Sequence, residues 1–282
     1  MENAGQMITR IGLLSCVNAA PIAGPWENSV DCGDWQLFGG SPAALDKMLE
    51  KGQIDMGFLS VAAYARNPEM FRILSGLSIS ACGQAGSVFL FSHIPLEQLN
   101  GVPVFVDTDS ATALGLLQIV LEEFHGVRPV YTLGKVQSGA EKGFKALLAS
   151  GDDALRILEK STFLYQYDLV DIWRRETTLP VVLGVFAVRE EFCRQREDTV
   201  IAVHRELLRC RDAGIADLVT VSNNTAMRIP MAKNRCCEYL AAMEYDLSGV
   251  KRKALETFVQ YTITRGDGSP QALPLKFFSH LY

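Results

Sequence analysis

The stretch "SPAALDKMLEKGQIDMGFLSVAAYARN", residues 41–67, decides the fold class. Its first part predicts a helix over residues 41–52, because Ser41 can cap the start and Gly52 suits the end. Residues 54–60 then form an apolar run with the length of a buried strand, and a second short helix follows at once. A strand enclosed by two helices is typical of an α/β protein.

The same alternation continues on both sides of this stretch. Strands are predicted at 10–15, 35–40, 71–80, 86–92, 102–108, 128–134 and 179–190, and helical patterns at 109–126, 151–160 and 167–177. After residue 190 helices dominate, over 190–214, 234–245 and 249–266. Such alternation predicts mostly parallel sheets covered by helices on both faces.

Two series of strands and helices, divided near residue 95, predict two lobes. The first lobe is expected to contain residues 1–93 and 187–282, and the second lobe residues 94–186. The strands at 87–92 and 179–190 are long enough to connect them. A ligand would then lie in a cleft between the lobes, at the carboxyl ends of the strands.

Composition narrows the range of partners. The chain has 282 residues, a formal net charge of −5 and a pI of about 5.5, without the clustered basic residues of a nucleic-acid-binding protein. No run of about 20 apolar residues suggests a membrane span, and no apolar signal segment lies in the first 15 residues. Seven cysteines occur without a CxxC pair, which favours reduced thiols in a cytoplasm and no metal or cofactor. The oligomeric state is left open.

The junctions where strands end are rich in Ser, Thr, Asn and Gly. They are residues 16–21, 39–42, 59–65, 78–87, 108–112 and 150–154. Helix N-termini with such residues bind carboxylates through backbone N–H groups and hydroxyls. We therefore expect a carboxylate-bearing small molecule, although each serine alone could simply be a helix cap. Cys16 lacks a nearby histidine and is interpreted as a half-buried core residue, not as a nucleophile.

These patterns describe a solute-binding module and a small-molecule enzyme equally well. Several motifs then resemble the chorismate dehydratase family: "VNAAPI" (17–22), residues 40–65, 77–101, "DSATALGLL" (109–117), "SGDDAL" (150–155) and residues 167–190. The resemblance implies a two-lobed α/β fold like that of type 2 periplasmic binding proteins, in a cytoplasmic lyase. This family removes water from chorismate to give 3-[(1-carboxyvinyl)oxy]benzoate in the futalosine route to menaquinone.

Two alternatives stay open beside this interpretation. The naphthoate-forming sister family of the same route begins with a Ser-Pro-Cys-Pro-Asn-Asp type motif, whereas this chain has Ser-Cys-Val-Asn-Ala-Ala there. That difference favours the dehydratase. The other alternative is a carboxylate-binding protein without catalysis.

The resemblance and the junctions together suggest roles for individual residues. Asn18 is the predicted catalytic side chain; an amide cannot act as a base near pH 7, so it should position and polarise. The predicted substrate-binding residues are Ser41, Ser60, Ser80, Ser87, Ser110, Thr112, Gly151 and Asp152. Because histidine and lysine are missing from the junctions, a carboxylate of the substrate is a candidate base. Asp46 stands where the family often has Asn.

Overall fold

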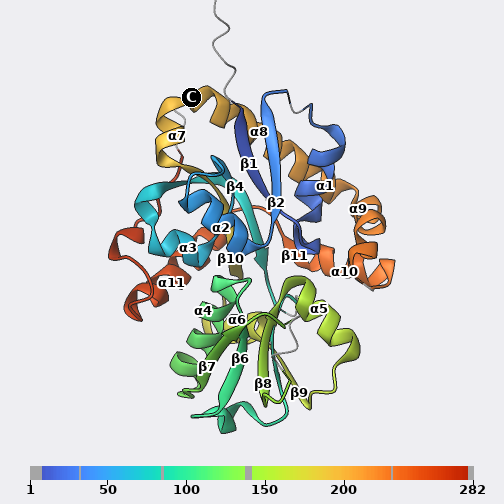
Figure 1. Ribbon diagram of the computed structural model, residues 1–282, viewed down its shortest axis with the longest axis vertical. Coiled ribbons are helices and arrows are strands. Elements are labelled where there is room, and N and C mark those ends of the chain that lie inside the picture. The colour runs from blue at the N-terminus through green and yellow to red at the C-terminus, as the bar shows by residue number, and fades with distance from the viewer. Residues whose placement is uncertain (1–7, 32, 84–85, 137–141, 230, 279–282) are drawn as a thin grey trace, which may run out of the picture.

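The structure is a computed structural model that describes residues 8–31, 33–83, 86–136, 142–229 and 231–278. It contains two sheets, one above the other along the longest axis of the molecule (Figure 1). The first has the order β11 (Met243–Glu244), β4 (Phe71–Ala81), β10 (Val181–Arg189), β3 (Met56–Ser60), β1 (Thr9–Leu14) and β2 (Trp35–Gly40). The second has the order β7 (Val130–Gly134), β6 (Pro103–Asp107), β8 (Ala146–Ser150), β5 (Val88–Ser92) and β9 (Tyr165–Asp168). The predicted two-lobed α/β fold is confirmed, and we call the parts built on these sheets the first and second lobes.

Helices cover both sheets. The first lobe carries α1 (Ala20–Ser29), α2 (Pro42–Glu50), α3 (Val61–Arg66), α7 (Glu190–Gln195), α8 (Glu197–Ala216), α9 (Leu218–Thr225), α10 (Lys233–Ala242) and α11 (Gly249–Thr264). The second carries α4 (Ala111–Gln118), α5 (Gly151–Lys160) and α6 (Leu169–Thr177). Short helical turns are η1 (Val17–Ala19), η2 (Pro68–Met70), η3 (Leu96–Leu99), η4 (Ile119–Phe124), η6 (Ala226–Arg228) and η7 (Pro270–Ala272).

The two sheets are mixed, so the prediction of mostly parallel sheets is wrong. The strands β2–β1–β3 and β7–β6–β8 run parallel, as expected for strands joined through helices. β10 is antiparallel to both β3 and β4, and β5 is antiparallel to both β8 and β9. β5 carries the chain into the second lobe and β10 carries it back, so each runs against the strands beside it.

The chain passes from one sheet to the other before each of the predicted lobe boundaries. β5 lies in the second sheet, although the boundary at residue 93 placed it in the first lobe. β10 lies in the first sheet, although most of it precedes the boundary at residue 187. All five residues of β5 are buried, and a strand buried on both faces shows no pattern that says which sheet it joins.

Local sequence explains the elements next to the cleft. β1 and β2 end within one residue of the predicted ends, where apolar runs meet small polar residues. The helix predicted over 109–126 starts as α4 and continues as the π-helical turn η4, with Ser110 as its cap.

Among the described residues, no helix has the length and apolar character needed to cross a membrane.

Candidate functional site

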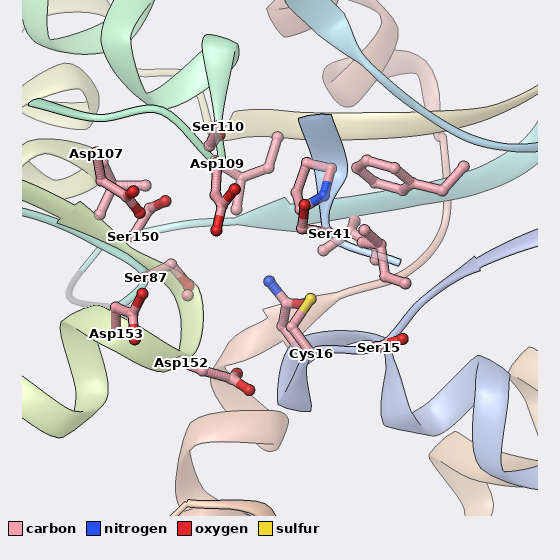
Figure 2. Close-up of a pocket in the computed structure, with 18 of the residues that line it drawn as sticks. Ser15, Cys16, Ser41, Ser87, Asp107, Asp109, Ser110, Ser150, Asp152 and Asp153 are labelled. Atoms are coloured by element: carbon pink, nitrogen blue, oxygen red, sulfur yellow. The ribbon is translucent and has the colours of Figure 1, made fainter. Parts of the chain in front are cut away.

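A cleft of about 230 Å³ lies between the two lobes, where strands of both sheets end (Figure 2). Its first wall comes from the first lobe and its second wall from the second lobe. The first wall contains Leu14, Ser15, Cys16, Asn18, Gly40, Ser41, Pro42, Phe58, Ile79 and Leu183. The second contains Ser87, Val88, Asp107, Asp109, Ser110, Ser150, Gly151, Asp152, Asp153 and Arg156.

The first wall has no ionisable acid or base besides the Cys16 thiol among its described residues. The turn η1 begins where β1 ends and carries Asn18, whose side chain is 8% exposed. The sulfur of Cys16 lies 2.8 Å from Oδ1 of Asn18 as a hydrogen-bond donor. Burial, with the nearby Asp152 carboxylate, raises the pKa of the Cys16 thiol, so the sulfur keeps its proton. The Asn18 oxygen is thereby engaged within the protein.

Ser41 occupies the N-cap position of α2 but does not cap it through its side chain. Pro42 follows at the first helical position and brings no N–H. Within the described part of the chain, no group hydrogen-bonds to the Ser41 hydroxyl, and Ser41 lines the cleft. Its hydroxyl is therefore open to a ligand.

The second wall carries four carboxylates, of which three are held by partners. Asp152 Oδ1 accepts from the Val17 N–H at 2.9 Å, Asp153 pairs with Arg156 at 2.8 Å, and Asp109 lies 3.3 Å from Lys135. Figure 2 shows Asp107, Asp109 and Asp153 on one side of the cleft, across from Cys16 and Ser41. The negative charge of this wall is thus partly neutralised by the protein itself.

Asp107 is the fourth carboxylate and is the most perturbed of the four. It is the last residue of β6 and is 4% exposed. Burial, together with the charges of Asp109 and Asp153, raises the pKa of Asp107 to about 6. A carboxyl group that titrates this close to neutral pH can give or take a proton in the cleft.

Serines and a glycine complete the second wall. The Ser110 oxygen accepts from the Ala113 N–H at 3.2 Å, which leaves its own hydrogen to donate. Ser87 is fully buried, and its oxygen lies 3.2 Å from the Tyr239 hydroxyl of α10. Gly151 has a φ of +56°, a conformation that favours glycine and that starts α5 directly after β8.

Hydrogen bonds across the cleft hold the lobes together. Backbone N–H groups at helix starts of the first lobe donate them, and acceptors of the second lobe receive them. Besides the Val17–Asp152 bond, the Ala43 N–H donates to the Asp109 carbonyl at 3.2 Å. The Ala62 N–H donates to Thr112 Oγ1, also at 3.2 Å. The structure is therefore in a closed arrangement.

Six of the nine predicted site residues line this cleft: Asn18, Ser41, Ser87, Ser110, Gly151 and Asp152. The other three lie outside its lining. Ser60 caps α3 and donates to the Asp46 carboxylate at 2.6 Å, and Ser80 lies 2.6 Å from Ser78 within β4. Thr112 accepts the bond from the other lobe described above. The hydroxyls of these three residues form hydrogen bonds within the protein. Their position near a strand end in the sequence does not reveal these bonds.

The sequence analysis missed Asp107, Arg156 and Ser15 as lining residues, and it placed Asp109 and Ser150 in the junctions without assigning them to the site. Asp107 lies one residue before the junction 108–112 that was singled out. Arg156 lies four residues after Asp152, which places both on one face of α5. Helical spacing from Asp152 could have found Arg156. In the described ranges, no group of three or more His, Cys, Asp or Glu residues is arranged to hold a metal ion.

Two sheets with a closed cleft between them define a class of protein, the fold of periplasmic binding proteins. A structure from Archaeoglobus fulgidus has a TM-score of 0.73 at 16% identity and covers 94% of this chain and 99% of its own. The periplasmic aliphatic sulphonate binding protein of Escherichia coli has a TM-score of 0.65 at 11% identity, covering 96% of this chain and 94% of its own. At these identities the likeness establishes the fold alone.

Sequence comparison identifies the family. The chain belongs to the menaquinone biosynthesis family, whose profile matches residues 9–263. A curated relative from Thermus thermophilus, named chorismate dehydratase, is 24% identical over 267 residues. The match covers 89% of this chain and 93% of the relative. The resemblance seen in the motifs is therefore supported over nearly the whole length.

Proposed function

We propose that this protein is a chorismate dehydratase, a lyase that removes water from chorismate to give 3-[(1-carboxyvinyl)oxy]benzoate. The observation that carries the proposal is the match to a chorismate dehydratase over 93% of that relative's length, within the menaquinone biosynthesis family. We place the reaction in the futalosine route and the protein in the cytoplasm. The cleft volume of about 230 Å³ lies just below the range of about 300–1,000 Å³ for ligand sites, so the closed cleft fits only a small substrate.

The reaction needs positioning and two proton movements. Losing the ring hydroxyl and the neighbouring ring hydrogen makes the ring aromatic, so the products are strongly favoured and the enzyme mainly holds geometry. Chorismate is a dianion, and the partners of Asp109, Asp152 and Asp153 reduce its repulsion from the second wall. The hydroxyls of Ser41 and Ser110, with the Arg156 guanidinium, supply donors for its carboxylates.

Asn18 and Asp107 divide the chemistry between the two walls. Asn18 donates a hydrogen bond to the substrate and does not take a proton. The ring hydrogen goes as a proton to a carboxylate of the substrate. Among the described residues no histidine or lysine lines the cleft, Asp109, Asp152 and Asp153 are held by protein partners, and Asp107 is needed as the acid. The hydroxyl leaves as water with a proton from Asp107, and the product carboxyl then returns a proton to Asp107. One water is lost and the enzyme is restored.

The test is to incubate the pure protein with chorismate and follow the aromatic absorbance and the mass of the product. We expect an aromatic product lighter than chorismate by one water. Unchanged chorismate would overturn the proposal. The same experiment with a cyclic futalosine tests the naphthoate-forming alternative.

A second candidate, a binding protein without catalysis, is compatible with the fold, which the sulphonate binding protein shares. Calorimetry with chorismate separates it from the first. Heat of binding without any turnover would support this candidate, whereas turnover would exclude it.

A further inference from the structure

We infer that Cys16 is a positioning residue that fixes the carboxamide of Asn18 so that only its NH₂ group faces the substrate. The inference rests on the proposed function and deepens it, since it assigns the direction of the hydrogen bond between Asn18 and the substrate. It starts from a thiol that the mechanism does not otherwise use.

The contact itself defines the orientation. Cys16 Sγ lies 2.8 Å from Asn18 Oδ1. A thiol has one hydrogen to donate, and an amide oxygen accepts it, whereas an amide nitrogen cannot accept. Because the oxygen and the nitrogen of a carboxamide lie on opposite sides of its carbon, the NH₂ group points away from the sulfur.

The nitrogen has no use inside the protein. No described residue accepts a hydrogen bond from Asn18 Nδ2, and this nitrogen is not among the buried side-chain atoms that lack a partner. Asn18 lines the cleft. The NH₂ group is therefore open to the space that a ligand would fill, and Asn18 presents a donor to it.

The surroundings keep Cys16 in the state that this role needs. Cys16 precedes η1, and its carbonyl accepts from the Ala19 N–H at 3.1 Å, which fixes the turn that carries both side chains. The Asp152 carboxylate is bound to the N–H of the next residue, Val17, at 2.9 Å. Burial first, and then the negative charge so close by, raise the pKa of the thiol and disfavour a thiolate, so the sulfur stays a donor. The lobe closure made by Asp152 thus also protects the hydrogen bond of the thiol.

Three variants test the inference: Cys16→Ala, which removes the donor, Cys16→Ser, which keeps one, and Cys210→Ala as a control. Cys210 is a buried thiol of α8 and does not line the cleft. We expect Cys16→Ala to lower kcat for chorismate about tenfold with KM within about threefold, the effect of one lost neutral hydrogen bond. Cys16→Ser and Cys210→Ala should stay within about threefold of the parent protein.

A double-mutant cycle shows whether Cys16 acts through Asn18. In an Asn18→Ala background, the change Cys16→Ala should have no further effect on kcat, because nothing is left to orient. A tenfold loss in both backgrounds would overturn the inference. So would Cys16→Ser being as slow as Cys16→Ala.

A second readout does not depend on turnover. The side-chain NH₂ signals of Asn18 in a ¹H–¹⁵N correlation spectrum are assigned by their loss in Asn18→Ala. They should keep their positions in Cys16→Ser and move in Cys16→Ala. Unchanged signals in Cys16→Ala would overturn the inference even in an active enzyme. Shifted signals in a protein that leaves chorismate unchanged would support it while overturning the proposed function.

Discussion

The two walls of the cleft differ in charge and in the direction of their hydrogen bonds. The first wall carries uncharged side chains, and helix starts of its lobe donate backbone N–H groups across the cleft. The second wall carries four carboxylates, and its residues Asp109 and Asp152 accept two of those bonds. A wall without ionised groups can hold a ring close at low cost, since no charged side chain on it has to lose solvating water. A wall with carboxylates can exchange protons with a ligand, and a carboxylate such as Asp152 can also bind the other lobe through a hydrogen bond.

The largest expected effect comes from placing an apolar group in the first wall. Asn18→Leu removes the only carboxamide that lines the described cleft and leaves the Cys16 thiol without its partner. We expect kcat for chorismate to fall by about 1,000-fold, the upper range for one lost transition-state donor. Product affinity, measured by calorimetry, should change much less. Turnover near that of the parent would remove Asn18 from the chemistry; Asn28→Leu, at an exposed position of α1, is the control.

A smaller loss is expected on the charged wall from Asp107→Asn. The amide keeps the shape but cannot give a proton, so kcat/KM should fall by about 100-fold near pH 6. The pKa of Asp107 is raised to about 6, and the protonated form is the active one. In the parent, kcat/KM should therefore decrease as the pH rises through 6, and Asp107→Asn should lose this step. If Asp107→Asn showed the same pH step, the step would belong to another group. The control for the change in net charge is Asp212→Asn, at an exposed position of α8.

The division between walls predicts that Asp152 acts on closure and not on chemistry. Asp152→Ala loses the bond to the Val17 N–H, so product affinity should weaken about tenfold. Asp152→Asn keeps an oxygen acceptor and should stay within about threefold. Product affinity is measured by calorimetry and kcat by the rate at saturating chorismate. If Asp152→Asn were as damaged as Asp152→Ala, the charge and not the closing bond would matter.

The first wall was easier to predict from the sequence than the second. β1 and β2 end where apolar runs meet small polar residues, so Asn18 and Ser41 were found at once. The sequence does not show in which direction a side chain within a junction points. Thr112 turns to the Ala62 N–H of the other lobe, while Ser110, two residues before it, lines the cleft.

The charged wall depends on contacts distant in sequence. The raised pKa of Asp107 requires burial together with Asp109 and Asp153, and Asp153 is 46 positions further along the chain. The partners of β5 and β10 also depend on tertiary context, because a mostly apolar strand fits a parallel or an antiparallel neighbour equally well. Strand ends are local signals, whereas the charge of a cleft is a property of the folded chain.

The smallest effect on activity is expected from a carboxylate that lies behind the first wall. Asp46 is 4% exposed on α2, and its oxygens accept from the Ser60 N–H at 2.9 Å and the Ser60 hydroxyl at 2.6 Å. Burial raises its pKa to about 6, from 3.8. Above pH 6 the folded protein must hold a buried charge, and an amide in the same place would not. Asp46→Asn should therefore leave kcat and KM within about twofold and raise the free energy of unfolding at pH 7.5 by about 2 kcal/mol.

The sign of this effect follows from the raised pKa. Below about pH 3 the Asp46 carboxyl is protonated in both the folded and the unfolded chain, so the parent and Asp46→Asn should be about equally stable there. As the pH rises from 4 to 6 the unfolded chain ionises first, and the parent loses stability relative to the variant. Urea unfolding of both proteins at pH 4, 5, 6 and 7.5 measures the gap. A difference in the free energy of unfolding that did not vary with pH would mean that it arises from packing and not from ionisation of Asp46. A lower kcat in Asp46→Asn would mean that the uncharged first wall depends on the charge behind it.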